Sequence, residues 1–208
     1  DHLLEYMTSL EGDVMIINEP GLIWNCKGLI ESTAAAHHME ALVATTEHSK
    51  AAGLVVILGP QWRKVKTKMS IMESKHKRLM NVEFKAKEKK GGRPLQRLHL
   101  SAIYGLNGPE TSQKNRQESS KLWETVIDSV ECFRSAHPLG SVVVAGDFNA
   151  AKSSKLDTNR KEAHEDSVEK DSHVLTALEG IGLCDTFRVA PPDLQAWTRE
   201  PTGDLQHV

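Results

Sequence analysis

Residues 142–150, VVVAGDFNA, decide the fold: a run of small apolar residues leads directly into Gly-Asp-Phe-Asn. A continuous apolar run of this length indicates a strand covered on both faces. Side chains two apart on an extended chain point the same way, so we expect Asp147 and Asn149 to emerge together while Phe148 turns back to the core. Gly146 would permit a ligand to approach the backbone closely. The alternative is a turn, where Asp and Asn are favoured for local hydrogen bonding.

Other segments also predict strands. Residues 13–18, DVMIIN, and 53–59, GLVVILG, are short apolar runs typical of buried strands. Residues 78–86, RLMNVEFKA, alternate apolar and polar side chains, and residues 97–104, RLHLSAIY, follow after a Gly-Gly turn. These last two segments predict an antiparallel hairpin.

Helices are predicted where apolar residues recur at helical spacing. Residues 119–137 carry one apolar stripe, and residues 173–183 carry a shorter one. Residues 24–49 fit either a helix or a strand, and both readings stay open. Strands alternating with helices, plus a hairpin, favour a layered α/β or α+β sandwich. A length of 208 residues is compatible with one domain spanning 1–208.

Composition excludes some classes of protein. No run approaches the ~20 apolar residues that a membrane helix needs, so we expect no membrane partner. The first residues lack a basic region followed by an apolar one, so no secretory signal is predicted. Three widely spaced cysteines without a CxxC pair indicate reduced thiols and an intracellular protein.

The charge is unevenly distributed. Residues 61–97 hold 13 of the 26 Lys and Arg residues but 3 of the 28 acidic ones. Such a segment suits a surface that faces phosphates, and we expect DNA to be the partner. The alternative is a solvated hairpin whose charged edges prevent aggregation. The side chains predicted to bind nucleic acid are Arg63, Lys64, Lys66, Lys68 and Arg78.

Two further strands end in polar side chains. Glu19 follows residues 13–18, and Tyr104 ends residues 97–104. Ligand sites in layered α/β folds lie at strand ends. We therefore expect Glu19 and Tyr104 to lie in one cleft with Asp147 and Asn149. Carboxylate and amide oxygens suit Mg²⁺ or Mn²⁺. Taken singly, Glu19 could be a solvated acid and Tyr104 a half-buried rim aromatic.

The ordered set of motifs resembles the endonuclease/exonuclease/phosphatase superfamily, which includes DNase I. The motifs are GDVMIINEP, GLVVILG, RLHLSAIYGLNGP, VVVAGDFNA and GIGLCDTFRVAPPDLQAWT, and they cover nearly the whole chain. The resemblance implies a four-layer α/β sandwich, with two mixed sheets face to face and helices outside. The closing motif is most similar to the endonuclease domains of LINE-type retrotransposons.

The resemblance also implies roles for single residues. Glu19 matches a metal-binding Glu, and Tyr104 matches a Tyr that contacts the scissile phosphate. Asp147 matches the Asp that aligns or deprotonates the attacking water, and Asn149 matches its partner on the phosphate. The implied reaction is hydrolysis of a phosphodiester with Mg²⁺ or Mn²⁺, in which the cation stabilises charge on phosphate oxygens.

The sequence departs from the family pattern in places. Asn18 stands where Gln is usual, and Arg199 follows Thr198 where Trp is usual. The family's first strand, with an Asn, and its last, with an Asp and often a His, have no counterpart. We therefore expect residues 1–208 to be the interior of a catalytic domain, poorly stable and inactive when expressed alone.

Three functions stay open at this point. The first is the DNA endonuclease domain of a retrotransposon polyprotein that also carries a reverse transcriptase, for which a nuclear site of action would be natural. The second is a phosphatase or lipid phosphodiesterase of the same superfamily. The third is an inactive remnant that only binds nucleic acid.

Overall fold

The computed structural model describes residues 4, 5, 7, 13–20, 26–45, 53–72, 77–85, 97–106, 112–149 and 174–186. The chain divides into two compact units, Asp1–Asn149 and Ala150–Val208. Every strand of the described residues belongs to the first unit. All of the predicted site residues lie in that unit as well, so its architecture is what positions the site.

The first sheet is built around β3 (Leu54–Leu58), and all five of its residues are buried. β1 (Val14–Asn18) and β2 (Glu40–Ala44) pair with its two edges, and both pairings are antiparallel. The structure confirms the buried strand that the apolar run predicts. It also resolves the open segment: α2 (Lys27–Ala36) is followed by β2, so both readings were partly right.

The second sheet has the order β4-β5-β6-β7 among the described strands. β4 (Lys66–Ile71), β5 (Leu79–Lys85) and β6 (Arg97–Tyr104) are antiparallel neighbours, which confirms the predicted hairpin. β7 (Ser141–Asp147) runs parallel to β6. A parallel pair needs a crossover, and α3 (Gln113–Ala136) provides it.

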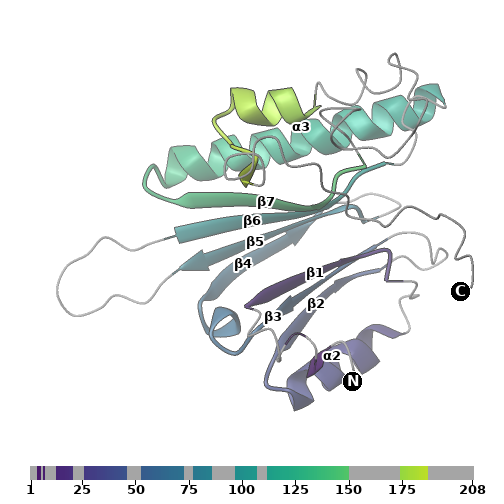
Figure 1. Ribbon diagram of the computed structural model, residues 1–208, viewed down its shortest axis with the longest axis vertical. Coiled ribbons are helices and arrows are strands. Elements are labelled where there is room, and N and C mark those ends of the chain that lie inside the picture. Colours follow the sequence, from purple (N-terminus) through teal and green to yellow (C-terminus); the bar gives the residue numbers. More distant parts are fainter. Residues whose placement is uncertain are drawn as a thin grey trace, which may run out of the picture. The chain divides into compact units, whose positions relative to one another are not determined.

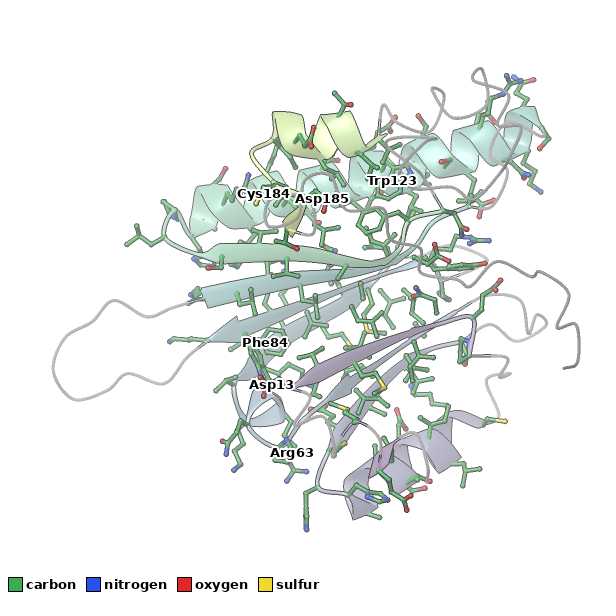
Figure 2. The ribbon with its side chains drawn as sticks, viewed as in Figure 1. Asp13, Arg63, Phe84, Trp123, Cys184 and Asp185 are labelled. Carbon is green, nitrogen blue, oxygen red and sulfur yellow. The ribbon has the colours of Figure 1, made fainter. Side chains whose placement is uncertain are left out.

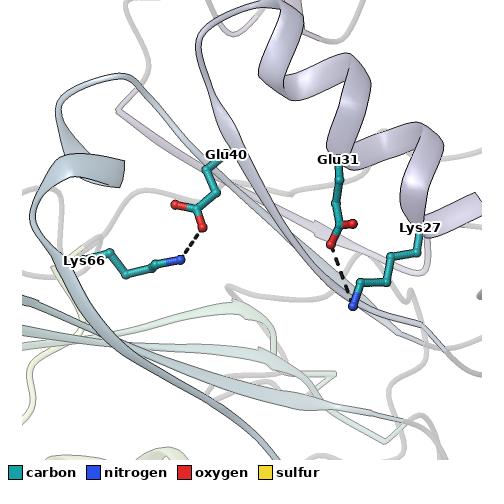
Figure 3. Close-up of polar contacts among 4 residues, drawn as sticks. All are labelled: Lys27, Glu31, Glu40 and Lys66. Atoms are coloured by element: carbon teal, nitrogen blue, oxygen red, sulfur yellow. Dashed lines mark hydrogen bonds and ion pairs between the residues drawn. The ribbon is translucent and has the colours of Figure 1, made fainter.

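The two sheets pack face to face around a common apolar core. Its buried side chains include Leu54, Val56 and Leu58 from β3 and Met80, Val82 and Phe84 from β5. Apolar burial on this scale is the main stabilising term of such a fold. At one end of the core, Lys66 of β4 forms an ion pair with Glu40 of β2, which joins the two sheets (Figure 3).

Helices cover the two outer faces (Figure 1). Ala34 of α2, with Leu4 and Met7 of a short N-terminal helical segment, packs on the first sheet. An exposed ion pair between Lys27 and Glu31 supports α2 at i,i+4 spacing, for about 0.3 kcal/mol (Figure 3). The layer order is therefore helix, sheet, sheet, helix, which confirms the predicted four-layer α/β sandwich.

The helix α3 covers the second sheet. It begins at Ser112, whose hydroxyl accepts a hydrogen bond from the Asn115 backbone N–H at 3.1 Å. The predicted apolar stripe is its buried face, made of Leu122, Trp123, Val126, Val130 and Phe133. The second sheet is mixed, as expected, whereas every pairing of the described strands in the first sheet is antiparallel.

β7 is less covered than its sequence predicts. Val143 is 44% exposed, although the apolar run of residues 142–145 predicts a strand covered on both faces. The reason is that, within the described residues, β7 pairs with β6 alone and lies at the edge of its sheet. In the second unit, residues 174–180 are helical, within the segment 173–183 that the sequence predicts as a helix, and Leu178 is buried. In the described part of the chain, no helix is long and apolar enough to cross a membrane.

Candidate active site

Three strands end at one edge of the first unit. β6 and β7 are parallel, so Tyr104 and Asp147 are paired at their carboxyl ends. Asn18, the last residue of β1, joins the other sheet to this edge. With its amide oriented to satisfy both groups, Asn18 donates to the Ile103 carbonyl (3.3 Å) and accepts from the Asp147 N–H (2.6 Å). Glu19 is thereby held beside the strand ends of the opposite sheet.

Tyr104 and Glu19 meet across the two sheets. Tyr104 is 5% exposed and belongs to the core between them. Burial raises the pKa of the Tyr104 phenol, and the hydrogen bond to Glu19 and the charge of that carboxylate raise the pKa further. Arg78 acts on this pKa in the opposite direction. The phenol therefore stays protonated near neutral pH, and its single O–H donates to the Glu19 carboxylate.

Asp147 and Asn149 are brought together by a turn. Asp147 Oδ1 accepts a hydrogen bond from the Asn149 backbone N–H at 2.9 Å, and Asn149 has a φ of 48°. Asn tolerates this left-handed conformation better than most residues. The expectation that the two side chains align along an extended chain is wrong, because the strand stops at Asp147. The turn is what places both groups at the strand end.

Two glycines allow the strands to approach each other here. Gly146 has a φ of 137°, and a Cβ at this position would collide with the Ile103 carbonyl oxygen. A Cβ on Gly105 would collide with the Phe148 carbonyl oxygen. The space at Gly146 that we expected a ligand to use is therefore taken by the backbone of the neighbouring strand. Phe148 turns toward α3 and stacks on Trp123, with ring centroids 5.6 Å apart.

The predicted nucleic-acid-binding residues fall into two places. Arg78 lies at the site: Nη1 donates to the Gly105 carbonyl at 2.9 Å and the Tyr104 carbonyl at 3.4 Å. The other four lie toward the opposite end of the strands, where Lys66 is aligned with Phe84, and Phe84 with Leu98. Six residues of strand separate Leu98 from Tyr104, which is about 20 Å.

At that opposite end, the basic residues differ in their partners. Figure 2 shows Asp13, Phe84 and Arg63 at this end of the strands. The carbonyl of Asp13, which precedes β1, accepts from the Gly59 N–H at 2.8 Å, whereas Glu19 follows the other end of β1. Arg63 and Lys64 are exposed on the short 3₁₀ helix η2 (Trp62–Lys64). Lys66 is paired with Glu40, and Lys68 lies 3.5 Å from Glu83. Part of the positive charge of this segment is thus used within the protein.

The site includes two residues that sequence reasoning did not assign to it. In the sequence, Asn18 stands where the family pattern has Gln, and Arg78 is predicted to bind nucleic acid. The position of Arg78 follows from the register of the hairpin. Because β5 is antiparallel to β6 and Leu79 pairs with Ile103, Arg78 lies level with Tyr104 at the end of β6. No comparable signal pointed to Asn18, because its partners belong to another sheet.

The side chains at this edge carry oxygen atoms, which are the type of ligand that a hard divalent cation binds. They are the carboxylates of Glu19 and Asp147, with an amide and a phenol nearby, and oxygen ligands are those that Mg²⁺ and Mn²⁺ prefer. No three His, Cys, Asp or Glu side chains cluster in a way that could hold a metal among the described residues.

No family model matches this sequence, and no curated protein matches it. Solved structures do resemble it. The 3'-5' exonuclease NExo of Neisseria meningitidis has a TM-score of 0.69 at 14% identity, with 92% of this chain and 70% of that chain covered. The catalytic domain of Xenopus laevis APE2 has a TM-score of 0.70 at 14% identity, covering 93% and 68%. A truncated Caenorhabditis elegans TDP2 has a TM-score of 0.50 at 12% identity, covering 72% and 54%. The chain therefore has the DNase I-like α/β fold.

Proposed function

We propose that this protein hydrolyses phosphodiester bonds in DNA with the aid of a divalent cation. The observation that carries the proposal is the meeting of Glu19, Tyr104 and the Asp147–Asn149 turn at one edge, where Asn18 bonds β1 to the ends of β6 and β7. These groups come from both sheets and from positions far apart in sequence. A polar cluster of this kind at strand ends is a typical ligand site of α/β folds.

Each side chain has a role that follows from its surroundings. Glu19 would hold Mg²⁺ or Mn²⁺, and when bound this ion would stabilise the negative charge on phosphate oxygens by several kcal/mol. The second oxygen of Asp147 would orient a water molecule and take its proton, since Oδ1 is used by the turn. One amide N–H of Asn149 donates to the Gly105 carbonyl at 3.0 Å, and the other N–H remains for a phosphate oxygen. Once Glu19 binds the cation, the Tyr104 phenol could turn its single O–H from Glu19 to the same phosphate.

DNA as the substrate is supported by two observations. Neighbours of the same fold are described as a 3'-5' exonuclease and as a 3' phosphatase bound to a product DNA hairpin. The basic residues about 20 Å from the site could contact phosphates roughly six base pairs away from the hydrolysed bond, at 3.4 Å per pair. Arg63 and Lys64, which are exposed, are best placed for this contact.

The biological setting that we propose is the endonuclease domain of a retrotransposon polyprotein, acting on nuclear DNA. It rests on the similarity of the motif that spans residues 183–198 to retrotransposon endonucleases. A reverse transcriptase encoded further along the same reading frame would support this setting. A frame that continues into an unrelated domain would count against it.

A second function, removal of phosphate from a DNA 3' end, is favoured by the phosphatase description of the Neisseria neighbour. The same site chemistry would serve both reactions. Two assays separate them, using the longest natural chain that contains these residues. Nicking of a supercoiled plasmid in Mg²⁺ supports the endonuclease, whereas release of phosphate from a 3'-phosphorylated hairpin without nicking supports the phosphatase. Neither reaction, in a folded protein supplied with Mg²⁺ or Mn²⁺, would refute the proposed function.

A further inference from the structure

Arg78 is held at the site by contacts of its side chain and of its backbone carbonyl, which accepts from the Tyr104 N–H at 2.9 Å. Its guanidinium carbon lies 4.6 Å from the centroid of the Tyr104 ring, within the range of a cation–π interaction. Its Nη1 donates to the carbonyls of Gly105 and Tyr104, at 2.9 Å and 3.4 Å. These contacts involve one proposed catalytic residue and the peptide that follows it.

The Gly105 peptide connects Arg78 to the rest of the site. Its carbonyl accepts from Arg78 and also from the Asn149 amide, at 2.9 Å and 3.0 Å. Its N–H donates to the Asp147 carbonyl at 2.7 Å. A displacement of Arg78 would therefore shift the Tyr104 phenol, the Asn149 amide and the end of β7 together.

Arg78 makes no direct ion pair with a carboxylate in the described part of the chain, and Glu19 interacts with it only by way of the Tyr104 phenol. Arg78 contacts two carbonyl oxygens, the Tyr104 ring and the Tyr104 phenol, and its Nε is enclosed without a hydrogen-bond partner. Lys66 and Lys68, by contrast, each have a glutamate. A partly buried charge is costly to keep without an opposite charge. An anionic substrate would provide the missing charge.

We propose that Arg78 is a positioning residue of this site, which keeps the Tyr104 ring and the Gly105 carbonyl in place and supplies a fixed positive charge for a substrate phosphate. The inference rests on the proposed function and deepens it. It differs from the surface role predicted from sequence, because Arg78 acts beside the reacting groups. It also differs from a metal role, since its charge is present with or without a bound cation.

Three variants of the longest natural chain test the inference. Arg78→Met removes the charge and the hydrogen bonds. Arg78→Lys keeps the charge but loses the planar guanidinium that contacts the Tyr104 ring and the two carbonyls. Arg116→Met, exposed on α3, is the matched control for loss of one arginine. Binding of a labelled DNA duplex is measured in EDTA over a series of salt concentrations, and kcat and KM for cleavage are measured in Mg²⁺.

The expected results separate charge from position. Arg78→Met should weaken metal-free binding about tenfold and reduce the slope of log affinity against log salt by about 0.9, the value for one phosphate contact. It should also lower kcat. Arg78→Lys should keep the salt slope and still lose kcat. If Arg78→Met fails to fold, the salt slope and kcat of Arg78→Lys decide.

Two outcomes would overturn the inference. Arg78→Met could match Arg116→Met in both salt slope and kcat, which removes Arg78 from the site's function while leaving the proposed function intact. Alternatively, Arg78→Lys could cleave at the wild-type rate, which removes the positioning role. A wild-type protein that neither binds nor cleaves DNA would instead refute the proposed function itself.

Discussion

In the proposed mechanism, the two oxygens of Asp147 have separate tasks. Oδ1 accepts the Asn149 backbone N–H and so fixes the turn, and the other oxygen is left for the chemistry. An Asp-to-Asn change separates the tasks, because the amide retains an oxygen that can accept the same hydrogen bond. It loses the basicity that removes a proton from water.

We therefore expect Asp147→Asn to reduce DNA cleavage by at least about 100-fold, since general base catalysis contributes that much or more. The melting temperature should stay close to that of the wild type. Plasmid nicking and thermal unfolding monitored by circular dichroism check both parts. Full retained activity would remove Asp147 from the mechanism, and a large loss of stability would show that the amide cannot replace the carboxylate in the turn.

Gly146 is required for a different reason. Its φ of 137° and the collision that a Cβ would make with the Ile103 carbonyl oxygen leave a side chain no room. Gly146→Ala should destabilise the protein by more than about 2 kcal/mol, because a rigid strand backbone must shift. The matched control is Gly28→Ala in α2, where nothing lies within 4 Å of the added atom. This change should stabilise the protein by roughly 0.5–1 kcal/mol, as expected for Gly in a helix. Equal effects in chemical denaturation would contradict the structure at Gly146.

At the scale of elements, the site depends on how the ends of β1, β6 and β7 are joined. The two sheets share an apolar core, but such packing is non-directional and does not fix the position of Glu19. The Asn18 amide does, through its bonds to the Ile103 carbonyl and the Asp147 N–H. Polar contacts of this kind give a specific geometry to an interface that apolar side chains hold together.

Asn18→Ala should cost about 1–3 kcal/mol of unfolding free energy, since it leaves two backbone groups without their partner. Cleavage should fall as well, because Glu19 loses its anchor. Gln61→Ala, at an exposed amide that makes no capping hydrogen bond, serves as the control and should change stability by less than about 0.5 kcal/mol. Asn18→Ala with the activity and stability of Gln61→Ala would show that the sheets are positioned by packing alone.

The packing of α3 on the second sheet predicts a dependence of stability on pH. His99 of β6 is 3% exposed, and its ring lies 5.1 Å from that of Phe133. Its Nε2 is 3.1 Å from Ser101 Oγ, which in turn donates to Asn81 at 2.8 Å, so Nε2 donates to the Ser101 hydroxyl. Burial lowers the pKa of His99; Glu83 opposes this shift, and Lys68 adds to it.

In the unfolded chain His99 titrates near its ordinary pKa of 6.5, and in the folded protein it titrates lower. The unfolded state therefore binds more protons between these two values, and stability decreases as pH falls below about 6.5. The His99 contribution is complete above that pH. Denaturant unfolding between pH 7.5 and 5.5 should show the loss, and His99→Gln should reduce it. A variant with the same pH dependence as the wild type would mean that other groups cause it.

At the scale of the whole molecule, the sequence predicts layers better than contacts. The layered arrangement followed from alternating apolar runs and helical stripes, because burial of one face sets the period of each element. Gly146 shows the limit: sequence suggested room for a ligand, and the structure has the Ile103 carbonyl there. The segments that meet, β6 and β7, are separated by α3, and no local pattern reports how closely two distant backbones approach.

The basic segment shows a second limit. Composition identified it, but its place along the strands follows from the pairing register, which puts Lys66 six residues from the level of Tyr104 and Arg78 beside it. The charges of Lys66 and Lys68 are also partly neutralised by glutamates from β2 and β5. Charge counts along a chain therefore overestimate the charge that a folded surface offers to DNA.

The account as a whole requires that Glu19, from one sheet, serves the same reaction as Asp147, from the other. The most direct test is a Mg²⁺ titration of plasmid nicking by the longest natural chain and by its Glu19→Gln variant. We predict that the wild type nicks only in the presence of the ion, and that the variant needs at least about tenfold more Mg²⁺ for half of its maximal rate. An unchanged titration in Glu19→Gln, or nicking by the wild type in EDTA, would contradict the account.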